Sequence, residues 1–359
     1  MLKIKEVKVQ GYKKIIEASD ETSKLHCFIA IHDTTLGPAL GGTRMYPYSR
    51  KQDALEDALR LAKGMTYKSA LAEDGLGGGK SVIIGNPITD KTPALLLAFA
   101  EAVNSLDGDY IAAEDMGTSP EDMLIMRKKT PYVVALPTEK SSGDPSHYTA
   151  RGVFHGLQAV AQKLWGDRSL KHKRIAIQGL GHVGGKLAGI LFWEGADLIL
   201  SDIDEQLLHA TALRYGAETR SPSDIYQVDC DILCPCAMGA SINDATTSKL
   251  RCKAVAGAAN NQLALPEHGL KLMEKKILYA PDYLINSGGI INVATELEPN
   301  GYDPKLARDR VEHIYERLLH LFDKAERQRK PASQVADEIA EYNLKHLIGK
   351  RKVPLIFNR

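Results

Sequence analysis

Apolar residues in the first part of the chain recur with two different periods. Residues 53–68 place leucines and alanines at helical spacing, with charged residues on the other side, so this segment is predicted to be an amphipathic helix. Residues 93–105 predict a second helix. Residues 25–32 and 81–85 are short runs rich in β-branched and aromatic residues, which is typical of buried strands. The first third of the chain is therefore expected to alternate strands and helices.

A different pattern of predicted strands and helices begins near residue 173. The sequence reads strand "RIAIQ", turn "GLGHVG", helix "GKLAGILFWEG" and strand "ADLILSD". Gly179, Gly181 and Gly184 form G-x-G-x-x-G between strand and helix, and Asp202 closes the second strand, as in a dinucleotide fingerprint. Three glycines at an ordinary tight turn are the alternative, which the flanking elements disfavour. The loop, including His182 and Val183, is expected to hold a pyrophosphate. Because Asp202 can bind ribose hydroxyls and would repel a 2′-phosphate, NAD is expected rather than NADP.

Three further β-like runs follow, each ending in small or amide residues. In a doubly wound sheet the residues just past the carboxyl ends of the strands line the ligand crevice. The candidates for cofactor contacts at these ends are Ala237, Asn260, Asn261 and Asn286. Each asparagine, taken alone, is also compatible with a plain turn.

The predicted class is α/β with two domains, a length of 359 residues being ample for two cores. We expect a mixed-sheet substrate and oligomerisation domain over residues 1–135, completed by a C-terminal helix at about 331–359. A Rossmann domain that binds NAD is expected over residues 136–330. The turn-rich stretch at 136–149 is the expected linker, and helical stretches are predicted at 303–329 and 332–348.

Composition narrows the partners. A formal net charge of +1, from 46 basic and 45 acidic residues, gives no reason to expect nucleic acid or a membrane surface, and favours a small neutral or zwitterionic substrate. The first ten residues contain no apolar signal region, and the apolar run at 93–103 is too short to span a bilayer, so a cytoplasmic protein is expected. The five cysteines predict reduced thiols. Their C-x3-C-x-C cluster is not a usual zinc pattern, so no metal is expected.

The stretch "LGGGKSVIIG" at 76–85 raises the question of a phosphate-binding loop. Asp74 stands where that motif needs its first glycine, and a strand follows Lys80 where a helix is required. A nucleotide phosphohydrolase is therefore disfavoured. Lys68, Lys80 and Asp115 could each be a solvated surface charge. A lysine packed against glycine beside a second cation has its ammonium form disfavoured, however, and becomes a usable base. The glycines at 77–79 are expected to remove side-chain bulk beside Lys80, and Asp115 is the candidate partner carboxylate.

Six segments then resemble, in order and spacing, the Glu/Leu/Phe/Val amino acid dehydrogenases related to glutamate dehydrogenase, and most closely the leucine dehydrogenases. They are "IAIHDTTLGPALGGTRMYPY", "LRLAKGMTYKSALAEDGLGGGKSVIIG", "AAEDMGTS", "GLGHVGGKLA", "AGAANNQL" and "INSGGIINVATEL". The resemblance covers nearly the whole chain. It implies NAD-dependent oxidative deamination of an L-amino acid in a cleft between two domains, and a homo-oligomer, commonly an octamer.

The resemblance also implies roles for individual residues. Lys68 matches the residue that pairs with the substrate α-carboxylate, Lys80 the base that activates water, and Asp115 the acid that carries protons to and from the amine. The remaining implied contacts are backbone approach at Gly41 and Gly42, the nicotinamide ribose and substrate amine at Asn261 and Asn286, and the cofactor at Thr149.

Substrate choice can be argued at one position. Glutamate-specific relatives carry a lysine where this sequence has Leu40, and a buried leucine cannot offset the desolvation of a carboxylate. Ala113, Ile290 and Val293 match the other side-chain contacts, so the expected substrates are leucine, valine and isoleucine. A phenylalanine dehydrogenase with a wider pocket is the nearest alternative, and an inactive NAD-binding protein is a more distant one, disfavoured because both lysines and the aspartate are retained.

The sequence departs from the leucine dehydrogenase pattern at two places. "GDPSHYTA" replaces "GNPSPVTA", which puts Asp144, His147 and Tyr148 near the linker, and His182 stands where relatives often have asparagine. Both changes fall on segments expected to affect cofactor affinity and domain closure, and neither touches Lys68, Lys80 or Asp115.

Overall fold

The computed structural model describes residues 1–139, 141–355 and 357, and the chain divides into two compact units. Unit 1 comprises Met1–Asp144, Asn292–Pro304 and Ala340–Arg359, and unit 2 comprises Pro145–Ile291 and Lys305–Ile339. The first division therefore falls after Asp144, whereas the sequence suggested residue 135. Unit 1 also includes residues 292–304, which the sequence analysis places in the NAD-binding domain.

Unit 1 contains a mixed six-stranded sheet in the order β1-β2-β3-β5-β4-β6. The first four strands of this order pair antiparallel, while β4 runs parallel to both β5 and β6. The strands are β1 (Lys3–Glu6), β2 (Lys14–Asp20), β3 (Leu25–Asp33), β4 (Ala39–Tyr46), β5 (Gly77–Ile84) and β6 (Tyr110–Glu114).

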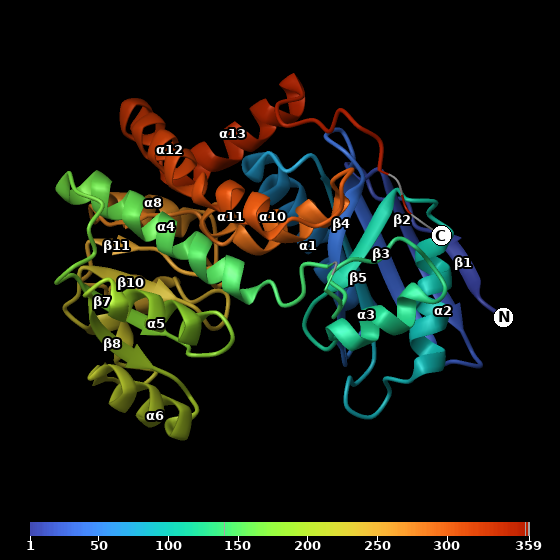
Figure 1. Ribbon diagram of the computed structural model, residues 1–359, viewed down its shortest axis with the longest axis horizontal. Helices are drawn as coiled ribbons and strands as arrows, with labels where there is room; N and C mark the ends of the chain where they lie inside the picture. Colours follow the sequence, from blue (N-terminus) through green and yellow to red (C-terminus); the bar gives the residue numbers. More distant parts are fainter. Residues whose placement is uncertain (140, 356, 358–359) are drawn as a thin grey trace. The chain divides into compact units, whose positions relative to one another are not determined.

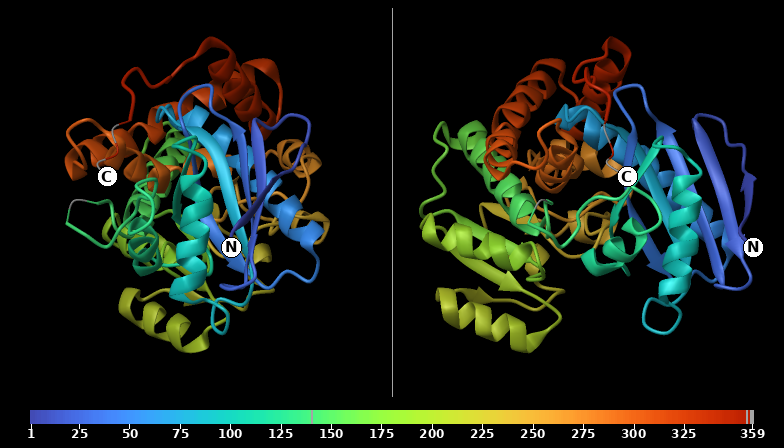
Figure 2. Two further views of the ribbon diagram at one scale, coloured as in Figure 1. Left: turned by 90° about the vertical axis from the view of Figure 1, so that its right-hand side faces the viewer. Right: turned by 45° about the vertical axis from the view of Figure 1, so that its right-hand side comes forward.

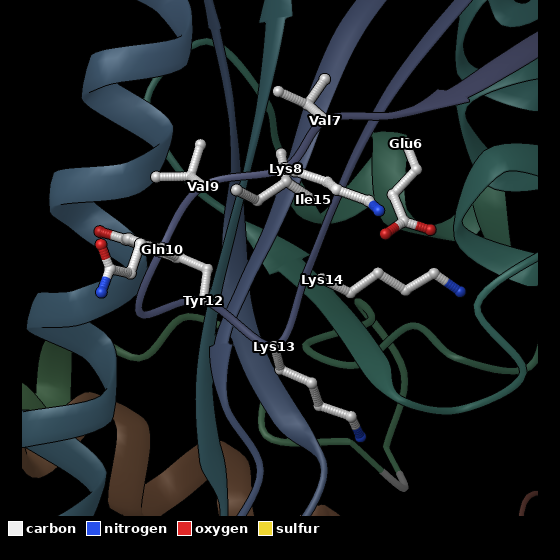
Figure 3. Close-up of a pocket in the computed structure, with 9 residues that line it drawn as sticks. All are labelled: Glu6, Val7, Lys8, Val9, Gln10, Tyr12, Lys13, Lys14 and Ile15. Carbon is white, nitrogen blue, oxygen red and sulfur yellow. The ribbon is translucent and has the colours of Figure 1, made fainter.

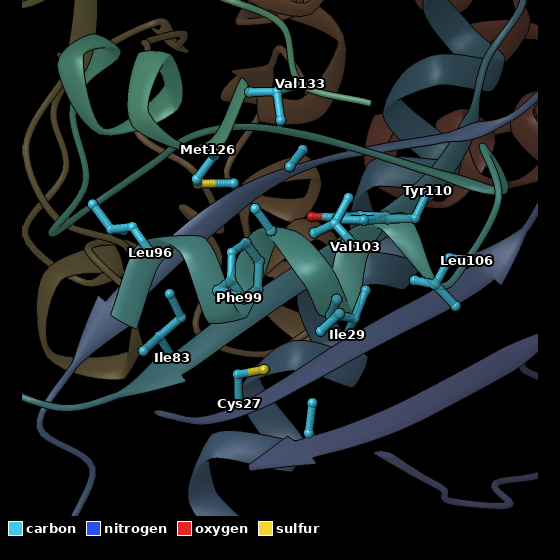
Figure 4. Packing of buried hydrophobic residues seen from close by; sticks show 14 of the residues in the cluster. Cys27, Ile29, Ile83, Leu96, Phe99, Val103, Leu106, Tyr110, Met126 and Val133 are labelled. Carbon is cyan, nitrogen blue, oxygen red and sulfur yellow. The ribbon is translucent and has the colours of Figure 1, made fainter. Parts of the chain in front are cut away.

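Helices cover both faces of this sheet (Figures 1 and 2). Helix α1 (Lys51–Ala72) lies on one face, where its alanines pack against Phe28 and Val82. Helices α2 (Pro93–Asn104) and α3 (Pro120–Arg127) lie on the other face and enclose the larger core, with Phe99 and Tyr110 at its centre (Figure 4). The helices predicted at 53–68 and 93–105 are therefore present, α1 extending further at both ends.

The triple glycine lies within strand β5, which begins at Gly77, four residues earlier than the strand predicted at 81–85. A Cβ at Gly77 would lie 2.1 Å from the carbonyl oxygen of Asp33, and one at Gly78 would lie 2.0 Å from the backbone nitrogen of Thr66 in α1. A Cβ at Gly79 would lie 2.7 Å from the Tyr110 ring. The neighbouring backbone and core therefore leave no room for side chains at these positions. The three glycines let β5 pack closely against α1 on one face of the sheet and against Tyr110 on the other.

Unit 2 contains a six-stranded parallel sheet in the order β12-β11-β10-β7-β8-β9. This is the doubly wound order, with its reversal between β7 and β10, where a ligand crevice is expected. The strands are β7 (Arg174–Gln178), β8 (Asp197–Ser201), β9 (Glu218–Thr219), β10 (Ile232–Pro235), β11 (Ala254–Val255) and β12 (Leu278–Tyr279).

Most remaining helices belong to unit 2. The stretch predicted as one helix at 303–329 is two helices, broken at His313, and the second of these packs on α4 where Gly156 allows close approach to Leu318. The helices are α4 (Ser146–Trp165), α5 (Gly184–Trp193), α6 (Glu205–Tyr215), α7 (Asp244–Thr247), α8 (Glu267–Glu274), α9 (Asp282–Ile285), α10 (Gly288–Ala294), α11 (Pro304–Glu312), α12 (Ile314–Gln328) and α13 (Ala332–His346), with short 3-10 turns at Ile225–Gln227 and Thr295–Leu297. Helices α10 and α13 each cross a division between the units.

The segment before α4 is held within unit 1 by one carboxylate. Glu296 accepts hydrogen bonds from the backbone nitrogens of Ala135 and Ser142, both at 2.9 Å, and from the Ser141 hydroxyl at 2.8 Å. This part of the expected linker is therefore anchored. None of the helices in the described residues is long and apolar enough to cross a membrane.

Candidate functional site

The two residues with the strongest chemical promise meet in unit 1. Lys80 lies in β5 and Asp115 directly follows β6, and their side chains form an ion pair between Nζ and Oδ2. Strand β4 runs between them, and its residue at this level is Gly42. A Cβ at Gly42 would lie 3.0 Å from Lys80 Nζ and 2.8 Å from Asp115 Cβ. The glycine that leaves room for the lysine amine is therefore Gly42, and the prediction that residues 77–79 do so is wrong.

Burial decides the electrostatics of this pair. Lys80 is only 6% exposed, and desolvation lowers its pKa, helped by the positive charge of Arg44 and opposed by Asp115. Burial alone would raise the pKa of Asp115, but Lys80 and Arg44 outweigh it and hold that pKa below its ordinary value. The pair thus combines a lysine that gives up its proton more readily than usual with a carboxylate that stays charged.

A second cation supports the carboxylate from β4. Arg44 donates from Nε to Asp115 Oδ2 at 3.2 Å and from a terminal nitrogen to Asp57 Oδ2 at 2.9 Å. Asp57, on α1, also accepts a hydrogen bond from the Tyr48 hydroxyl at 2.5 Å and pairs with Arg60 at 2.7 Å. A continuous chain of charges therefore links α1 to the Lys80–Asp115 pair.

Glu114 adds a titrating group beside the pair. Burial, followed by the negative charges of Asp144, Glu121 and Asp115, raises the pKa of Glu114 to about 7. Asp144 is one of the departures noted in the sequence, and here it acts as a like charge on Glu114. This carboxyl is consequently poised to change charge near neutral pH.

The other predicted residues of unit 1 lie on β4, β6 and α1. Leu40 precedes Gly42 on the β4 face that α1 covers, and it is 2% exposed. Ala113 is the β6 neighbour of Gly42 in the parallel register. A Cβ at Gly41 would lie 2.0 Å from the Gly79 carbonyl oxygen, so the two strands approach closely there. Lys68 lies half-buried in the last two turns of α1.

The glycine-rich turn of unit 2 leads from β7 into α5, as the fingerprint predicts. Gly179 adopts a φ of +96°, and a Cβ there would lie 2.7 Å from the Ala237 Cβ at the end of β10. A Cβ at Gly184 would lie 1.9 Å from the Gly179 carbonyl oxygen. A Cβ at Gly181, in contrast, would meet no described atom within 4 Å. His182 is exposed and Val183 half-buried. This turn is thus tightly packed on one side and open on the other.

Asp202 lies at the end of β8, beside this turn. Its Oδ2 accepts a hydrogen bond from the Leu180 nitrogen at 2.6 Å, and its Oδ1 accepts one from the Asp204 nitrogen at 2.8 Å. Each carboxylate oxygen retains a lone pair for a further donor, such as a ribose hydroxyl. The arrangement fits the adenosine end of a dinucleotide.

The amide residues gather at the carboxyl ends of β11 and β12. The Asn286 amide donates to Asn260 Oδ1 at 2.7 Å and to the Ala258 carbonyl oxygen at 3.0 Å. Asn286 Oδ1 is buried and has no hydrogen-bond partner within the described residues, which is a group that a ligand could satisfy. Asn261 has a φ of +52° and donates its backbone N–H to Asp282 at 2.5 Å. Thr149 lies in the first turn of α4, and its hydroxyl is 3.0 Å from the Pro145 carbonyl oxygen.

The two remaining residues expected to line the substrate pocket fall on either side of a unit boundary. Ile290 belongs to unit 2 and Val293 to unit 1, although both lie on α10. Their common contact with a substrate stays a prediction.

Two other features of the described residues are a cavity and a buried thiol. A cavity of about 320 Å³ lies at the β1–β2 hairpin of unit 1, lined by residues 6–10 and 12–15, and none of the predicted site residues takes part in it (Figure 3). Cys234 donates its thiol to the Ala256 carbonyl oxygen within the unit 2 sheet, and no group of three or more metal-ligating side chains occurs in the described part of the chain.

Sequence reasoning missed Arg44, Asp57, Tyr48 and Glu114. One signal could have found Arg44: it follows Leu40 and Gly42 at a spacing of two, so it shares their face once this segment is known to be a strand. The partner on α1 carries no such signal, because its position depends on how the helix packs on the sheet.

Comparisons with known proteins identify the family of this chain. The family model for the "Glu/Leu/Phe/Val dehydrogenase, dimerisation domain" matches residues 6–132, and that for "Glutamate/Leucine/Phenylalanine/Valine dehydrogenase" matches residues 202–345. A leucine dehydrogenase of Thermoactinomyces intermedius is 49% identical over 92% of this chain and 90% of its own. A phenylalanine dehydrogenase of Lysinibacillus sphaericus is also 49% identical, over 89% of this chain and 84% of its own.

A solved structure, L-tryptophan dehydrogenase from Nostoc punctiforme, matches with a TM-score of 0.82 and 39% identity, over 94% of this chain and 97% of that one. The predicted two-domain α/β class and the resemblance drawn from the sequence motifs are confirmed. The chain belongs to the Glu/Leu/Phe/Val dehydrogenase family of amino acid dehydrogenases.

Proposed function

We propose that this enzyme catalyses the NAD-dependent oxidative deamination of branched-chain aliphatic L-amino acids to 2-oxo acids and ammonium. The observation that carries the proposal is the buried Lys80–Asp115 pair beside Gly42. On the same face of β4, two residues before Gly42, lies the apolar and buried Leu40. In this proposal unit 1 binds and converts the substrate, and unit 2 binds NAD.

The residues of unit 2 fit such a cofactor. The open side of Gly181 and the N-terminus of α5 suit a pyrophosphate, and Asp202 suits the ribose hydroxyls of NAD. Asn286 Oδ1 and the neighbouring Asn260 are assigned to the nicotinamide end, with Thr149, Ala237 and the turn residues His182 and Val183 as further contacts. When bound, NAD accepts the hydride from the substrate Cα.

The chain's own residues then manage protons and water. Lys68 holds the substrate α-carboxylate. Loss of hydride leaves an iminium carbon, which water attacks while Lys80 takes the water's proton. Asp115 carries the proton that the departing amine needs, so ammonium and the 2-oxo acid are formed. Gly41 and Gly42 are assigned to a close approach of the protein backbone to the substrate, and Asn261 is assigned to the substrate amine.

The choice of substrate follows from the apolar residue at position 40. Leu40 is buried, and a carboxylate side chain placed beside it would lose its hydration without a compensating partner. Ala113 from β6 and Val293 from α10 are assigned to the same pocket, and Ile290 is assigned to the substrate side chain as in the resemblance. We therefore propose leucine, valine and isoleucine as substrates, with discrimination among them of about 1 to 3 kcal/mol per methylene.

Phenylalanine dehydrogenase is the second candidate function. The Lysinibacillus relative named for phenylalanine is as identical to this chain as the leucine dehydrogenase described above. Ala113 is small, and a small residue beside Gly42 would favour a bulkier ring. The two activities share the mechanism and differ only in pocket width.

One experiment separates these candidates. The purified protein is mixed with NADH, ammonium and one of four 2-oxo acids, and absorbance at the reduced nicotinamide band is followed. We expect turnover with 4-methyl-2-oxopentanoate and 3-methyl-2-oxobutanoate and none with 2-oxoglutarate. Turnover with phenylpyruvate alone would contradict the aliphatic assignment. NADPH in place of NADH is the cofactor control.

The setting of the enzyme is part of the same proposal. The five cysteines are all free thiols, which suits a reducing compartment, and we propose a cytoplasmic enzyme. A family domain described as a dimerisation domain supports a homo-oligomer, for which we propose an octamer. Light scattering coupled to gel filtration would measure its mass.

A further inference from the structure

The Asp115 carboxylate faces two cations, and only one of them has a role in the proposed reaction. Lys80 reaches Asp115 Oδ2 from β5, and Arg44 Nε reaches the same oxygen from β4 at 3.2 Å. Two cations on a single oxygen leave the second carboxylate oxygen, Oδ1, with no side-chain contact from either of them. Arg44 therefore affects both where this carboxylate points and how its charge is divided.

The orientation of Arg44 is itself fixed. Its terminal nitrogen is held by Asp57 Oδ2 at 2.9 Å, and that oxygen also accepts from the Tyr48 hydroxyl. The Arg44 side chain is 18% exposed and that of Asp57 13%, so water competes weakly for these contacts. A planar guanidinium that binds two carboxylates through different nitrogens has little rotational freedom, which a lysine ammonium at the same place would not share.

We propose that Arg44, anchored by Asp57, is a positioning residue for the deamination reaction: it holds Asp115 in place opposite Lys80 and takes up part of its negative charge. The inference rests on the proposed function. It deepens that function by adding a residue that touches neither substrate nor cofactor in the assignment above.

The charge balance explains why such a residue is needed. A lone Asp115 would stabilise the ammonium form of Lys80, which is useless as a base. Arg44 opposes this effect, because it repels the ammonium and satisfies the same carboxylate. The pKa of Lys80 is accordingly lowered, with burial as the main cause and Arg44 as a contributor.

The other groups around the pair come from the same elements. Glu114 and Tyr110 from β6 sense the charge of Asp115, and Asp57 on α1 senses Lys80. Asp57 favours the ammonium form of Lys80 and so raises the pKa of Lys80, whereas Arg44 lowers it. Arg60 is exposed and pairs with Asp57, so it is linked to Asp115 only through Asp57 and Arg44.

The test is the pH dependence of kcat/KM for deamination of the best substrate found, in the full-length oligomer. For Arg44→Met we expect the acidic limb, where Lys80 loses its proton, to move up by about one pH unit, with a loss of roughly tenfold near neutral pH. Arg44→Lys keeps the charge without the bridge to Asp57, so we expect an acidic limb close to that of the wild type but a lower kcat.

Arg60→Met is the matched control. It removes a guanidinium that also contacts Asp57 but not Asp115, and its acidic limb should coincide with that of the wild type. For Arg44→Ala, millimolar guanidinium should restore part of the rate, an effect that a merely structural role would not give. Far-ultraviolet circular dichroism and thermal unfolding check that each variant is folded; if Arg44→Met and Arg44→Ala are not, Arg44→Lys decides.

The outcomes separate the two proposals. A wild-type enzyme with no turnover on any amino acid tested would overturn the proposed function and this inference with it. An active wild type whose folded Arg44→Met variant keeps the same acidic limb, without guanidinium rescue of Arg44→Ala, would overturn this inference alone. An unchanged kcat in Arg44→Lys would equally contradict the requirement for the bridge.

Discussion

Glycine-rich segments occur in both units, and they serve opposite purposes. In β5 of unit 1 a Cβ at Gly78 would lie 2.0 Å from the backbone of α1, so the glycine is required by the protein itself. In the β7–α5 turn of unit 2 a Cβ at Gly181 would meet no described atom within 4 Å. The first glycine closes a packed interface and the second keeps a surface open. The same residue type therefore indicates packing in one unit and an open surface in the other.

The largest expected effect on stability comes from Gly78→Ala. The methyl group must displace either β5 or α1, and overpacking of this kind costs about 3 kcal/mol or more in the free energy of unfolding. Denaturant unfolding followed by circular dichroism measures this loss. Gly64→Ala is the matched control, since a Cβ there has no described atom within 4 Å and the residue lies within α1, so stability should rise by ~0.5 to 1 kcal/mol. Equal stability of the two variants would show that β5 is not tightly packed on α1.

The second effect is on catalysis, from Lys80→Ala. Removal of the proposed general base should lower kcat for deamination by roughly 10²- to 10⁴-fold. Because the pKa of Lys80 is lowered, the wild-type rate should rise with pH and level off below the ordinary pKa of a lysine. Steady-state kinetics between pH 6 and 11 measures both properties, with the exposed Lys5→Ala as control. Normal activity of Lys80→Ala would rule out its assignment as the base.

The third effect is on cofactor binding, from Gly181→Ala. With open space around this position, the free energy of unfolding should change by less than about 0.5 kcal/mol. A side chain there would keep the backbone from a pyrophosphate, so the Kd for ADP should rise roughly tenfold or more. Isothermal titration calorimetry with ADP and with adenosine tests this, since only ADP carries a pyrophosphate. A variant that lost stability and kept ADP affinity would reverse the contrast with Gly78.

The smallest effect concerns Glu114. Its pKa is raised from 4.5 to about 7, so the folded protein binds an extra proton between these values and stability falls as pH rises through this window. Glu114→Gln removes that penalty and should raise the free energy of unfolding by about 1 kcal/mol at pH 8, after allowance for partial exposure, and by almost nothing at pH 4. Denaturant unfolding at both pH values is the measurement. The exposed Glu139→Gln should show no such difference, and equal gains at both pH values for Glu114→Gln would contradict the electrostatic cause.

Much of the fold could be predicted from local patterns. Helices α1 and α2, strand β3 and the β7–α5–β8 unit follow from hydrophobic periodicity, because each buries one face against a neighbouring element. The errors fall where long-range packing overrides a local rule. The local pattern starts a strand only at residue 81 because glycine disfavours strands, yet β5 begins at Gly77 and needs these glycines to fit between α1 and Tyr110. The helix expected at 303–329 breaks at His313, for which its apolar pattern gave no sign.

The candidate site shows the same split. Lys80, Asp115 and Leu40 were recognisable from motifs, as were the fingerprint glycines and Asp202, because each motif is contiguous in the sequence. Arg44 and Asp57 were not assigned, since their contact joins a strand to a helix that is placed by burying Ala54, Ala58 and Ala62.

The sequence by itself determined the family, and it gave the expected chemistry and the expected apolar character of the substrate pocket, because these depend on residue types at fixed spacing. Only the tertiary structure decided which glycine leaves room for the Lys80 amine and which cation shares Asp115 with it. Gly42 and Arg44 acquire these roles from strands β5 and β6 on either side of β4. Burial supplies the physical reason: in a desolvated site each neighbouring charge acts strongly on the others, and which charges are neighbours is settled by how the sheet and α1 pack together.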